Sequence, residues 1–190
     1  FDIGGFAGEL PTPELYMRAT QLACFVPVMQ WHSEPDGGQF RLLQPGMEGN
    51  NERSPWNLAA AWGAPEFVDE MRFWHNLRMN LLPYLYSTAL DCVEQSRPMM
   101  RPLVYQWPED LQAWECEDEF LLGDSLLVAP LLEENVDARP VYLSEGEWIG
   151  LFDRRVVPGG QTILAGGDGK LPVFLRAGCG LALWLDESLT

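Results

Sequence analysis

Two stretches decide how the fold of this chain is interpreted: FDIGGF at residues 1–6 and VMQWHSE at residues 28–34. Each has the pattern of a buried strand that ends in a loop carrying an ionisable side chain, Asp2 in the first and His32 in the second. Two glycines follow the aspartate and would let the backbone bend sharply and come close to a ligand. The stretches therefore predict two strand ends that each present a polar group, as strand ends of an α/β barrel do.

The segment between these stretches has the signals of a helix. Thr12 is placed to cap it, Pro13 suits the first helical position, and Glu14 complements the helix dipole. Four residues share one face at helical spacing: Leu15, Ala19, Leu22 and Ala23. The apolar run at residues 24–29 then predicts a short strand buried on both faces. This order of strand, helix and strand is the repeating unit of an α/β barrel or a doubly wound sheet.

A polar segment from Ser33 to Trp62 comes next. It is rich in glycine, proline and asparagine, which predicts a long loop of the kind usually found in functional or disordered regions. Trp56 and Trp62 indicate that the end of this loop packs down. From Pro65 onward the apolar residues follow helical spacing, and Pro83 is expected to kink this long helix or divide it in two.

From Pro98 onward, short apolar runs alternate with turn signals. The runs lie at residues 104–105, 125–132, 140–143, 162–164, 171–175 and 180–185. Turn sequences such as SEG at residues 144–146 and PGG at residues 158–160 separate them. This alternation predicts an antiparallel β-sandwich. We therefore expect two domains that meet near Arg97, an α/β part at residues 1–97 and an all-β part at residues 98–190.

The α/β part contains only two predicted strands. Two strands can neither close a barrel nor bury both faces of a parallel sheet. The sequence therefore leads us to expect that these residues complete a larger barrel.

Charge and composition narrow the classes of partner. The formal net charge is −16, with 28 acidic and 12 basic side chains, of which Lys170 is the sole lysine. Nucleic acids and anionic membranes need a basic face and are not expected partners. An acidic chain with eight tryptophans suits neutral, polyhydroxylated ligands better. No apolar run reaches the roughly 18 to 20 residues that span a bilayer.

The four cysteines are scattered and include no C-x-x-C pair. This spacing argues against a zinc site and against a disulfide framework, so reduced thiols are expected. Reduced thiols favour a cytoplasmic location. We expect neither a metal nor a cofactor.

The candidate ligand-binding residues are Asp2, Phe6, Trp31 and His32. Phe6 could close over the apolar face of a sugar ring, while Asp2 and His32 would offer hydrogen bonds. Each has a structural alternative: the first stretch could be an ordinary turn, His32 a structural side chain, and Trp31 part of the core.

Other polar features suggest no chemistry. The acidic cluster at residues 115–119 lacks the glycine pattern of a calcium loop and is expected on the solvated surface. His75 has no H-E-x-x-H partner, which excludes a zinc-protease motif. No nucleophile elbow, Walker loop or dinucleotide fingerprint occurs.

Motifs along nearly the whole chain resemble those of glycoside hydrolase family 31, the α-glucosidase and α-xylosidase family. They are DIGGF at residues 2–6, PTPELY at 11–16, FVPVM at 25–29 with His32, LLPYLY at 81–86, PMMRPL at 98–103, LGDSLLVAP at 122–130, VYL at 141–143 with Gly146 and Trp148, and LPVFLRAG at 171–178. Their order and spacing carry the resemblance.

The resemblance implies the last two strand–helix units of a (β/α)8 TIM barrel, followed by the proximal C-terminal β-sandwich. It implies a retaining α-glycosidase that hydrolyses α-linked glucosides or xylosides, with two carboxylates ~5 to 5.5 Å apart and a covalent glycosyl-enzyme. In the family, both catalytic aspartates precede the DIGGF segment, so no catalytic residue is expected here. Asp2 matches a residue that supports the sugar pocket, Phe6 an aromatic residue that lines it, and His32 a histidine that binds sugar hydroxyls.

The chain departs from the family pattern at two places. Gln30 stands where many relatives have an arginine, which exchanges a positive charge for a neutral amide. The segment from Ser33 to Asn51 is longer than in several relatives and could reshape the entrance for substrate. The expected partners are an α-linked oligosaccharide and the remainder of the barrel. The alternative is a non-catalytic carbohydrate-binding or scaffold protein built from the same elements, which an exposed apolar surface disfavours.

Overall fold

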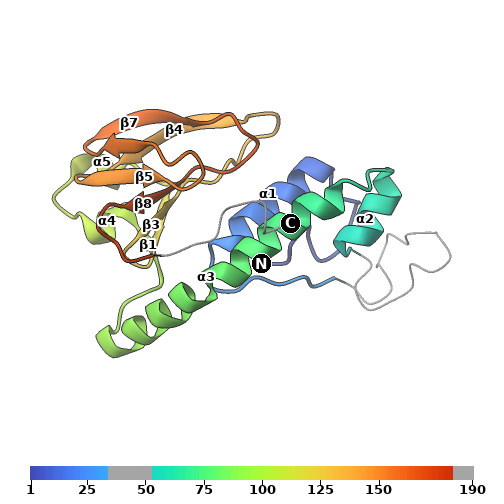
Figure 1. Ribbon diagram of the computed structural model, residues 1–190, viewed down its shortest axis with the longest axis horizontal. Coiled ribbons are helices and arrows are strands. Elements are labelled where there is room, and N and C mark those ends of the chain that lie inside the picture. Colours follow the sequence, from blue (N-terminus) through green and yellow to red (C-terminus); the bar gives the residue numbers. More distant parts are fainter. Residues whose placement is uncertain (34–52, 182–190) are drawn as a thin grey trace. The chain divides into compact units, whose positions relative to one another are not determined.

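The computed structural model describes residues 1–33 and 53–181, which form two compact units (Figure 1). The first unit contains Phe1–Met79 and the second begins at Asn80. This division falls inside helix α3 (Phe67–Gln95). The predicted domain boundary near Arg97 stays a prediction.

The first unit begins with a glycine-containing turn and helix α1 (Pro13–Cys24). The predicted cap is confirmed, because the Thr12 hydroxyl accepts a hydrogen bond of 3.1 Å from the N–H of Leu15. The buried face agrees with the predicted one at Ala23, which is fully buried, and at Ala19, which packs against the core, but not at Leu15. Leu15 is 58% exposed, whereas Tyr16 is fully buried and joins the core of this unit. The buried face of the helix thus includes Tyr16 in place of Leu15.

The predicted strand at residues 24–29 is not formed as a strand. Cys24 is the last residue of α1, and the backbone leaves it through a bend. The parallel pairing that exists is a single bridge between Asp2 and Gln30. A strand buried on both faces needs a hydrogen-bonded neighbour along each edge, and the described residues of this unit supply only that bridge.

Helix α2 (Pro55–Trp62) replaces the end of the predicted loop. Ser54 stands at its cap position, Pro55 opens it, and Gly63 ends it in the left-handed conformation with φ of 68°. The loop prediction is therefore wrong for these residues, whose start and stop signals are those of a short helix. Residues 34–52 of the predicted loop lie outside the described residues.

Helix α3 passes through Pro83 without being divided. Proline has no N–H, so the carbonyl of Met79 lacks its helical hydrogen-bond donor. The two compact units also divide directly after Met79. The start of α3 contributes Phe67 and Met71 to the core of the first unit.

The second unit is a β domain with two short helices, α4 (Leu103–Gln106) and α5 (Leu111–Trp114). Its strands are β1 (Met100–Pro102), β2 (Phe120–Leu122), β3 (Leu126–Val128), β4 (Ala138–Leu143), β5 (Glu147–Gly150), β6 (Val156–Pro158), β7 (Gln161–Gly166) and β8 (Val173–Arg176). Six of them form a sheet in the order β1-β2-β3-β8-β5-β6, and β4 pairs with β7 in a second sheet. All of these pairings are antiparallel.

The two sheets lie against each other (Figure 1). Side chains from both sheets form one core. Trp148 of β5 is fully buried there, and its indole N–H donates to the carbonyl of Ser144 over 2.9 Å. The predicted strand at residues 104–105 is wrong, because both residues belong to α4. An apolar run of two residues has no period that distinguishes a strand from a helix.

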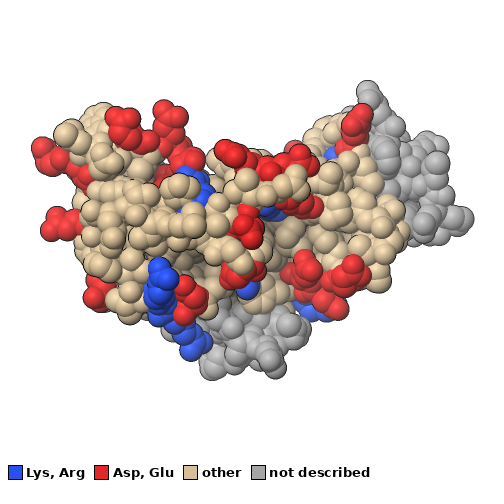
Figure 2. All heavy atoms as spheres, turned by 90° about the horizontal axis from the view of Figure 1, so that it is seen from above, with Lys and Arg blue, Asp and Glu red and all other residues tan. Residues whose placement is uncertain are grey.

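Acidic side chains are scattered over the molecular surface shown in Figure 2, while Lys and Arg side chains show at isolated places. This distribution accords with the formal charge of −16. None of the described helices has the length and hydropathy needed to cross a membrane.

Candidate functional site

Asp2 and Gln30 lie side by side and bring the two stretches from the start of the chain together. The N–H of Ile3 donates to the carbonyl of Gln30 over 3.2 Å. The Gln30 amide nitrogen in turn donates to Oδ1 of Asp2 over 2.8 Å. A neutral amide therefore holds the Asp2 carboxylate in this chain.

A tight turn after Asp2 requires its two glycines. Gly4 and Gly5 have φ angles of 77° and 85°, in the region that side chains other than glycine rarely adopt. A Cβ on Gly4 would lie 2.4 Å from Cδ2 of Tyr16, which is closer than two carbon atoms can approach. The N–H of Gly5 donates to the carbonyl of Asp2 over 2.9 Å and closes the turn. The turn directs the chain onward to Phe6.

Arg53 holds this glycine turn from a distant part of the sequence. Its guanidinium donates to the carbonyls of Gly4 over 2.7 Å, Gly8 over 2.6 Å and Glu9 over 3.1 Å. Arg53 is 5% exposed, and its own carbonyl accepts a hydrogen bond of 2.6 Å from the Tyr16 hydroxyl. Burial raises the pKa of Tyr16, so this hydroxyl stays a donor.

Sequence reasoning missed Arg53. An arginine in a polar segment is expected in solvent, and nothing near it in the sequence distinguishes it. Its role depends on carbonyl groups more than forty residues away along the chain.

Asp2, Phe6 and His32 gather into one group. His32 Nδ1 lies 3.7 Å from Asp2 Oδ1. The rings of Phe6 and His32 meet edge to face, with their centroids 5.0 Å apart. The side chain of His32 is 64% exposed and that of Asp2 is 26% exposed, so both can reach a ligand in solvent.

This group combines a carboxylate acceptor, an imidazole that can donate or accept, and an aromatic ring. Neutral hydroxyl-bearing molecules need both hydrogen-bond donors and acceptors, while the C–H face of a sugar ring packs against an aromatic side chain. The arrangement therefore suits the binding of a hydroxylated ring. The assignment of these residues to a substrate stays a prediction.

Trp31 belongs to a different set of contacts. Its ring lies edge to face with those of His75 and Trp56, at centroid distances of 4.8 and 5.8 Å. It packs against the core of the first unit. The indole N–H of Trp31 and Nε2 of His75 are both buried, and neither has a hydrogen-bond partner among the described residues. Burial lowers the pKa of His75, which favours its neutral form.

Metal-binding side chains do not cluster in the described residues. Neither 1–33 nor 53–181 contains a group of three or more His, Cys, Asp or Glu side chains placed to hold an ion. The four cysteines are free thiols, and burial raises the pKa of Cys24 to about 12. Cys24 is therefore a protonated thiol, and its S–H donates to the carbonyl of Trp74 over 3.2 Å.

Comparison with known proteins relates both parts of the chain to one family. Residues 1–88 match the TIM-barrel domain of glycosyl hydrolases family 31, and residues 96–179 match the C-terminal domain of the same family. An isomaltosyltransferase of Sporosarcina globispora is 38% identical over 187 residues, covering 98% of this chain and 16% of its own length. A 1,3-alpha-isomaltosidase of Kribbella flavida is 36% identical over 177 residues, covering 93% of this chain and 23% of its own length.

A solved structure agrees with these relatives. The cycloalternan-forming enzyme of Listeria monocytogenes, in complex with a pentasaccharide substrate, superposes with a TM-score of 0.82 at 40% identity, covering 94% of this chain and 16% of that one. The chain thus spans about a sixth to a quarter of the length of these proteins. Two family domains match in order along the chain, and the chain belongs to glycoside hydrolase family 31, with the end of the family's TIM barrel followed by its C-terminal β domain.

Proposed function

We propose that these residues form part of the sugar-binding pocket of a retaining enzyme that acts on α-linked glucose oligosaccharides. The gathering of Asp2, Phe6 and His32 beside the glycine turn carries the proposal. The names of the relatives support the substrate class, since the isomaltosyltransferase and the 1,3-alpha-isomaltosidase both act on isomaltosyl groups. Hydrolysis and glycosyl transfer share the covalent intermediate of a retaining enzyme and differ in whether water or a sugar hydroxyl accepts the glycosyl group.

Each residue of the group has a distinct role in this proposal. Asp2, held by Gln30, accepts a hydrogen bond from a sugar hydroxyl. His32 binds a neighbouring hydroxyl through its imidazole, and Phe6 covers the apolar face of the ring. Arg53 positions the turn that carries Asp2 and Phe6, without touching the sugar itself.

The reacting carboxylates are a separate part of the proposal. A retaining mechanism needs a nucleophile and an acid/base about 5 to 5.5 Å apart. The family resemblance assigns these roles to aspartates that precede the DIGGF motif, and the proposal gives Asp2 a binding role. We propose a cytoplasmic location, which the four free thiols support.

Replacement of His32 tests the proposed pocket. In the enzyme that contains this chain, His32→Ala is expected to lower kcat/KM for isomaltosyl substrates by about 2 to 4 kcal/mol of transition-state stabilisation, or roughly 30- to 800-fold. Thermal unfolding should change little, because the His32 side chain is 64% exposed. The measurements are steady-state kinetics and a melting curve for each variant.

Two controls make this result specific. His32→Gln keeps a hydrogen-bonding side chain and should lose less activity than His32→Ala. Arg72→Ala changes a half-exposed side chain on α3 and should leave kcat/KM unaffected. If His32→Ala has the kcat/KM of the wild type, His32 is a structural residue and the proposed pocket is wrong.

A further inference from the structure

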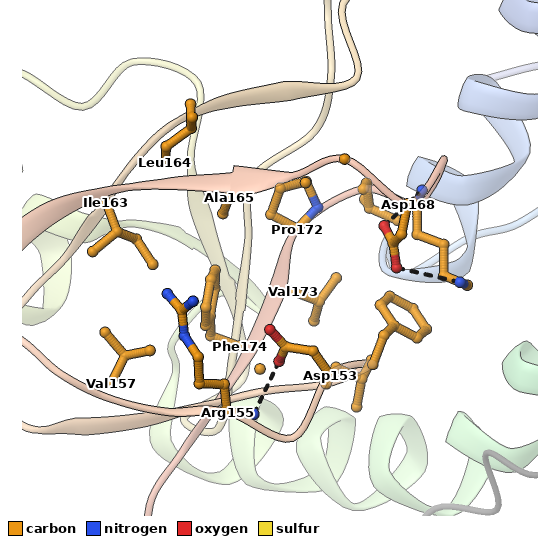
Figure 3. A pocket seen from close by; sticks show the side chains of 17 residues that line it. Asp153, Arg155, Val157, Ile163, Leu164, Ala165, Asp168, Pro172, Val173 and Phe174 are labelled. Atoms are coloured by element: carbon orange, nitrogen blue, oxygen red, sulfur yellow. Dashed lines mark hydrogen bonds and ion pairs between the residues drawn. The ribbon is translucent and has the colours of Figure 1, made fainter.

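The β domain contains a cavity that the proposed pocket does not use. Its volume is about 240 Å³. Figure 3 shows the side chains that line it. It lies between the turn that joins β5 to β6, strand β7, and the segment that leads into β8. The volume is below the roughly 300–1,000 Å³ of sites for drug-sized molecules, so the cavity suits a ligand of one or two small rings.

The turn between β5 and β6 gives one wall of this cavity a defined shape. The N–H of Gly150 donates to the carbonyl of Arg155 over 2.9 Å, and the N–H of Arg154 donates to the carbonyl of Gly150 over 3.0 Å. Oδ1 of Asp153 accepts a hydrogen bond of 3.0 Å from the N–H of Arg155. A Cβ on Gly150 would lie 2.0 Å from the same Oδ1, so only glycine allows Asp153 this position.

The turn also includes a strained residue. Arg154 has a φ of 59°, which is unfavourable for a side chain other than glycine. Strain of this kind persists where the surrounding contacts hold the backbone in place. These contacts hold the Asp153 carboxylate and the backbone of Arg155 in place before any ligand binds.

The charges of the cavity balance. Asp153 and Asp168 face Arg155 and Lys170 among the lining residues. Lys170 Nζ pairs with Asp168 Oδ2 at 3.3 Å and lies 5.5 Å from the centre of the Phe152 ring. The Arg155 guanidinium makes no hydrogen bond or ion pair with the described residues, and Figure 3 shows it pointing toward Phe174. The cavity therefore holds a cationic donor that is available to a ligand.

The remaining wall is apolar. Val157, Val173 and Phe174 are buried, at 5%, 2% and 6% exposure, and Ile163 lies beside them. This surface can cover the C–H groups of a ring but offers no hydrogen bonds. Polar side chains at one side and apolar side chains at the other match a molecule with a hydroxylated edge and an apolar face.

We propose that this cavity binds one or two rings of a neutral saccharide, as a second carbohydrate site of the chain. Sugar hydroxyls can accept from Arg155 and Lys170 and donate to Asp153. A neutral ligand fits because the four charges sum to zero and because the net charge of −16 repels anions. The choice of an α-glucoside as the ligand rests on the proposed function, whereas the preference for a neutral ring rests on the cavity itself.

Binding can be measured on the whole chain in a background in which the proposed first site is weakened. With His32→Ala in place, titration with isomaltose is followed by saturation-transfer NMR and by calorimetry. We expect binding in this background, and Arg155→Gln should weaken it at least about tenfold through the loss of a charged hydrogen bond. Arg154→Gln is the matched control, because it removes the same charge from the adjacent residue, which does not line the cavity.

Glucose and glucuronate then distinguish a saccharide site from an anion site. We expect glucose to bind at least as tightly as glucuronate, which adds a carboxylate to the same ring. Tighter binding of glucuronate, or equal isomaltose affinity in Arg155→Gln and Arg154→Gln, overturns the proposal. Absence of isomaltose binding in the His32→Ala background also overturns it. None of these results bears on the kinetics of His32→Ala, so the two proposals fail separately.

Discussion

At the residue scale, the carboxyl group of Glu119 is buried beside strand β4. Its Oε1 accepts a hydrogen bond of 2.9 Å from the N–H of Tyr142, while Oε2 has no hydrogen-bond partner among the described residues. Burial raises the pKa of this carboxyl to about 7, with Asp118 adding to the shift and Arg139 opposing it. The expectation that residues 115–119 all lie on the solvated surface is wrong for Glu119, which directly precedes the inward-facing strand β2.

This buried carboxyl predicts a specific pH dependence of stability. In the folded state Glu119 titrates at about 7, above its ordinary value of 4.5, so the folded state binds more protons between these values. Its contribution to the free energy of unfolding is present below pH 4.5 and is lost as the pH rises to about 7. Glu119→Gln should remove this loss. The free energy of unfolding, measured in urea, should then differ less between pH 5 and pH 8 than it does in the wild type.

The neighbouring residue Glu117 provides the control. It is exposed, and Glu117→Gln should keep the pH dependence of the wild type. The free energy of unfolding could instead change between pH 5 and pH 8 by the same amount in the wild type and in Glu119→Gln. That result would show that Glu119 does not titrate as proposed.

At the element scale, the C-terminal part of α3 is fastened to the turn between β2 and β3. The Tyr84 hydroxyl donates to the carbonyl of Leu122 over 2.6 Å and accepts from the N–H of Ser125 over 3.2 Å. Asp124 in the same turn pairs with Arg97 at 3.0 Å and with Arg101, which is 1% exposed. Although burial opposes the effect, these two arginines lower the pKa of Asp124. The turn thus joins a long helix to the first strands of the sheet.

Gly123 makes this close packing possible. Its φ is 62°, and a Cβ there would lie 2.4 Å from the Tyr84 hydroxyl oxygen and 2.9 Å from Cγ2 of Thr88. Gly123→Ala is therefore expected to destabilise the protein by about 2 to 5 kcal/mol, from about 1–2 for the left-handed backbone and about 1–3 for the overpacking. Chemical denaturation at fixed pH measures the change.

Substitution of Gly160 distinguishes the cost of the left-handed backbone from the cost of overpacking. Its φ is 74°, and a Cβ there has no atom within 4 Å. Gly160→Ala should show the backbone term alone, or about 1–2 kcal/mol. If both variants lose the same stability, the contact between α3 and the turn contributes nothing and the packing argument is wrong.

At the scale of the whole molecule, the chain matches parts of two family domains, and the resemblance places both catalytic aspartates before the DIGGF motif. The prediction is that the 190-residue chain alone releases no nitrophenol from aryl α-glucosides. The physical reason is that a retaining mechanism needs two carboxylates at defined separation, and the resemblance assigns both to residues that precede DIGGF. The measurement is absorbance of released nitrophenol over several hours with highly purified protein.

A matched control guards against contaminating enzyme. Nitrophenol release could instead keep the same specific activity after a second purification step and be lost in Asp2→Asn. This result would show that the residues of this chain carry out the cleavage. Release that falls with purification leaves the prediction standing.

Much of the local structure could be predicted from the sequence because its signals are local. The Thr12 cap, the long helix from residue 67 and the glycine turns between strands depend on residues within a few positions of one another. The order of the family motifs likewise indicated a barrel end followed by a β domain, and the family matches confirm this fold class.

Sequence by itself therefore determined the family, the change from an α/β part to a β domain, and the glycine turn that follows an aspartate. Tertiary structure alone decided that Gln30 holds Asp2, that Arg53 holds the turn, and that Glu119 is buried. It also decided that Trp31 contacts His75, and not the group formed by Asp2, Phe6 and His32. The reason is physical: capping and turn preferences arise within a few residues, whereas hydrogen-bond partners and desolvation depend on groups that are brought together only when the chain folds.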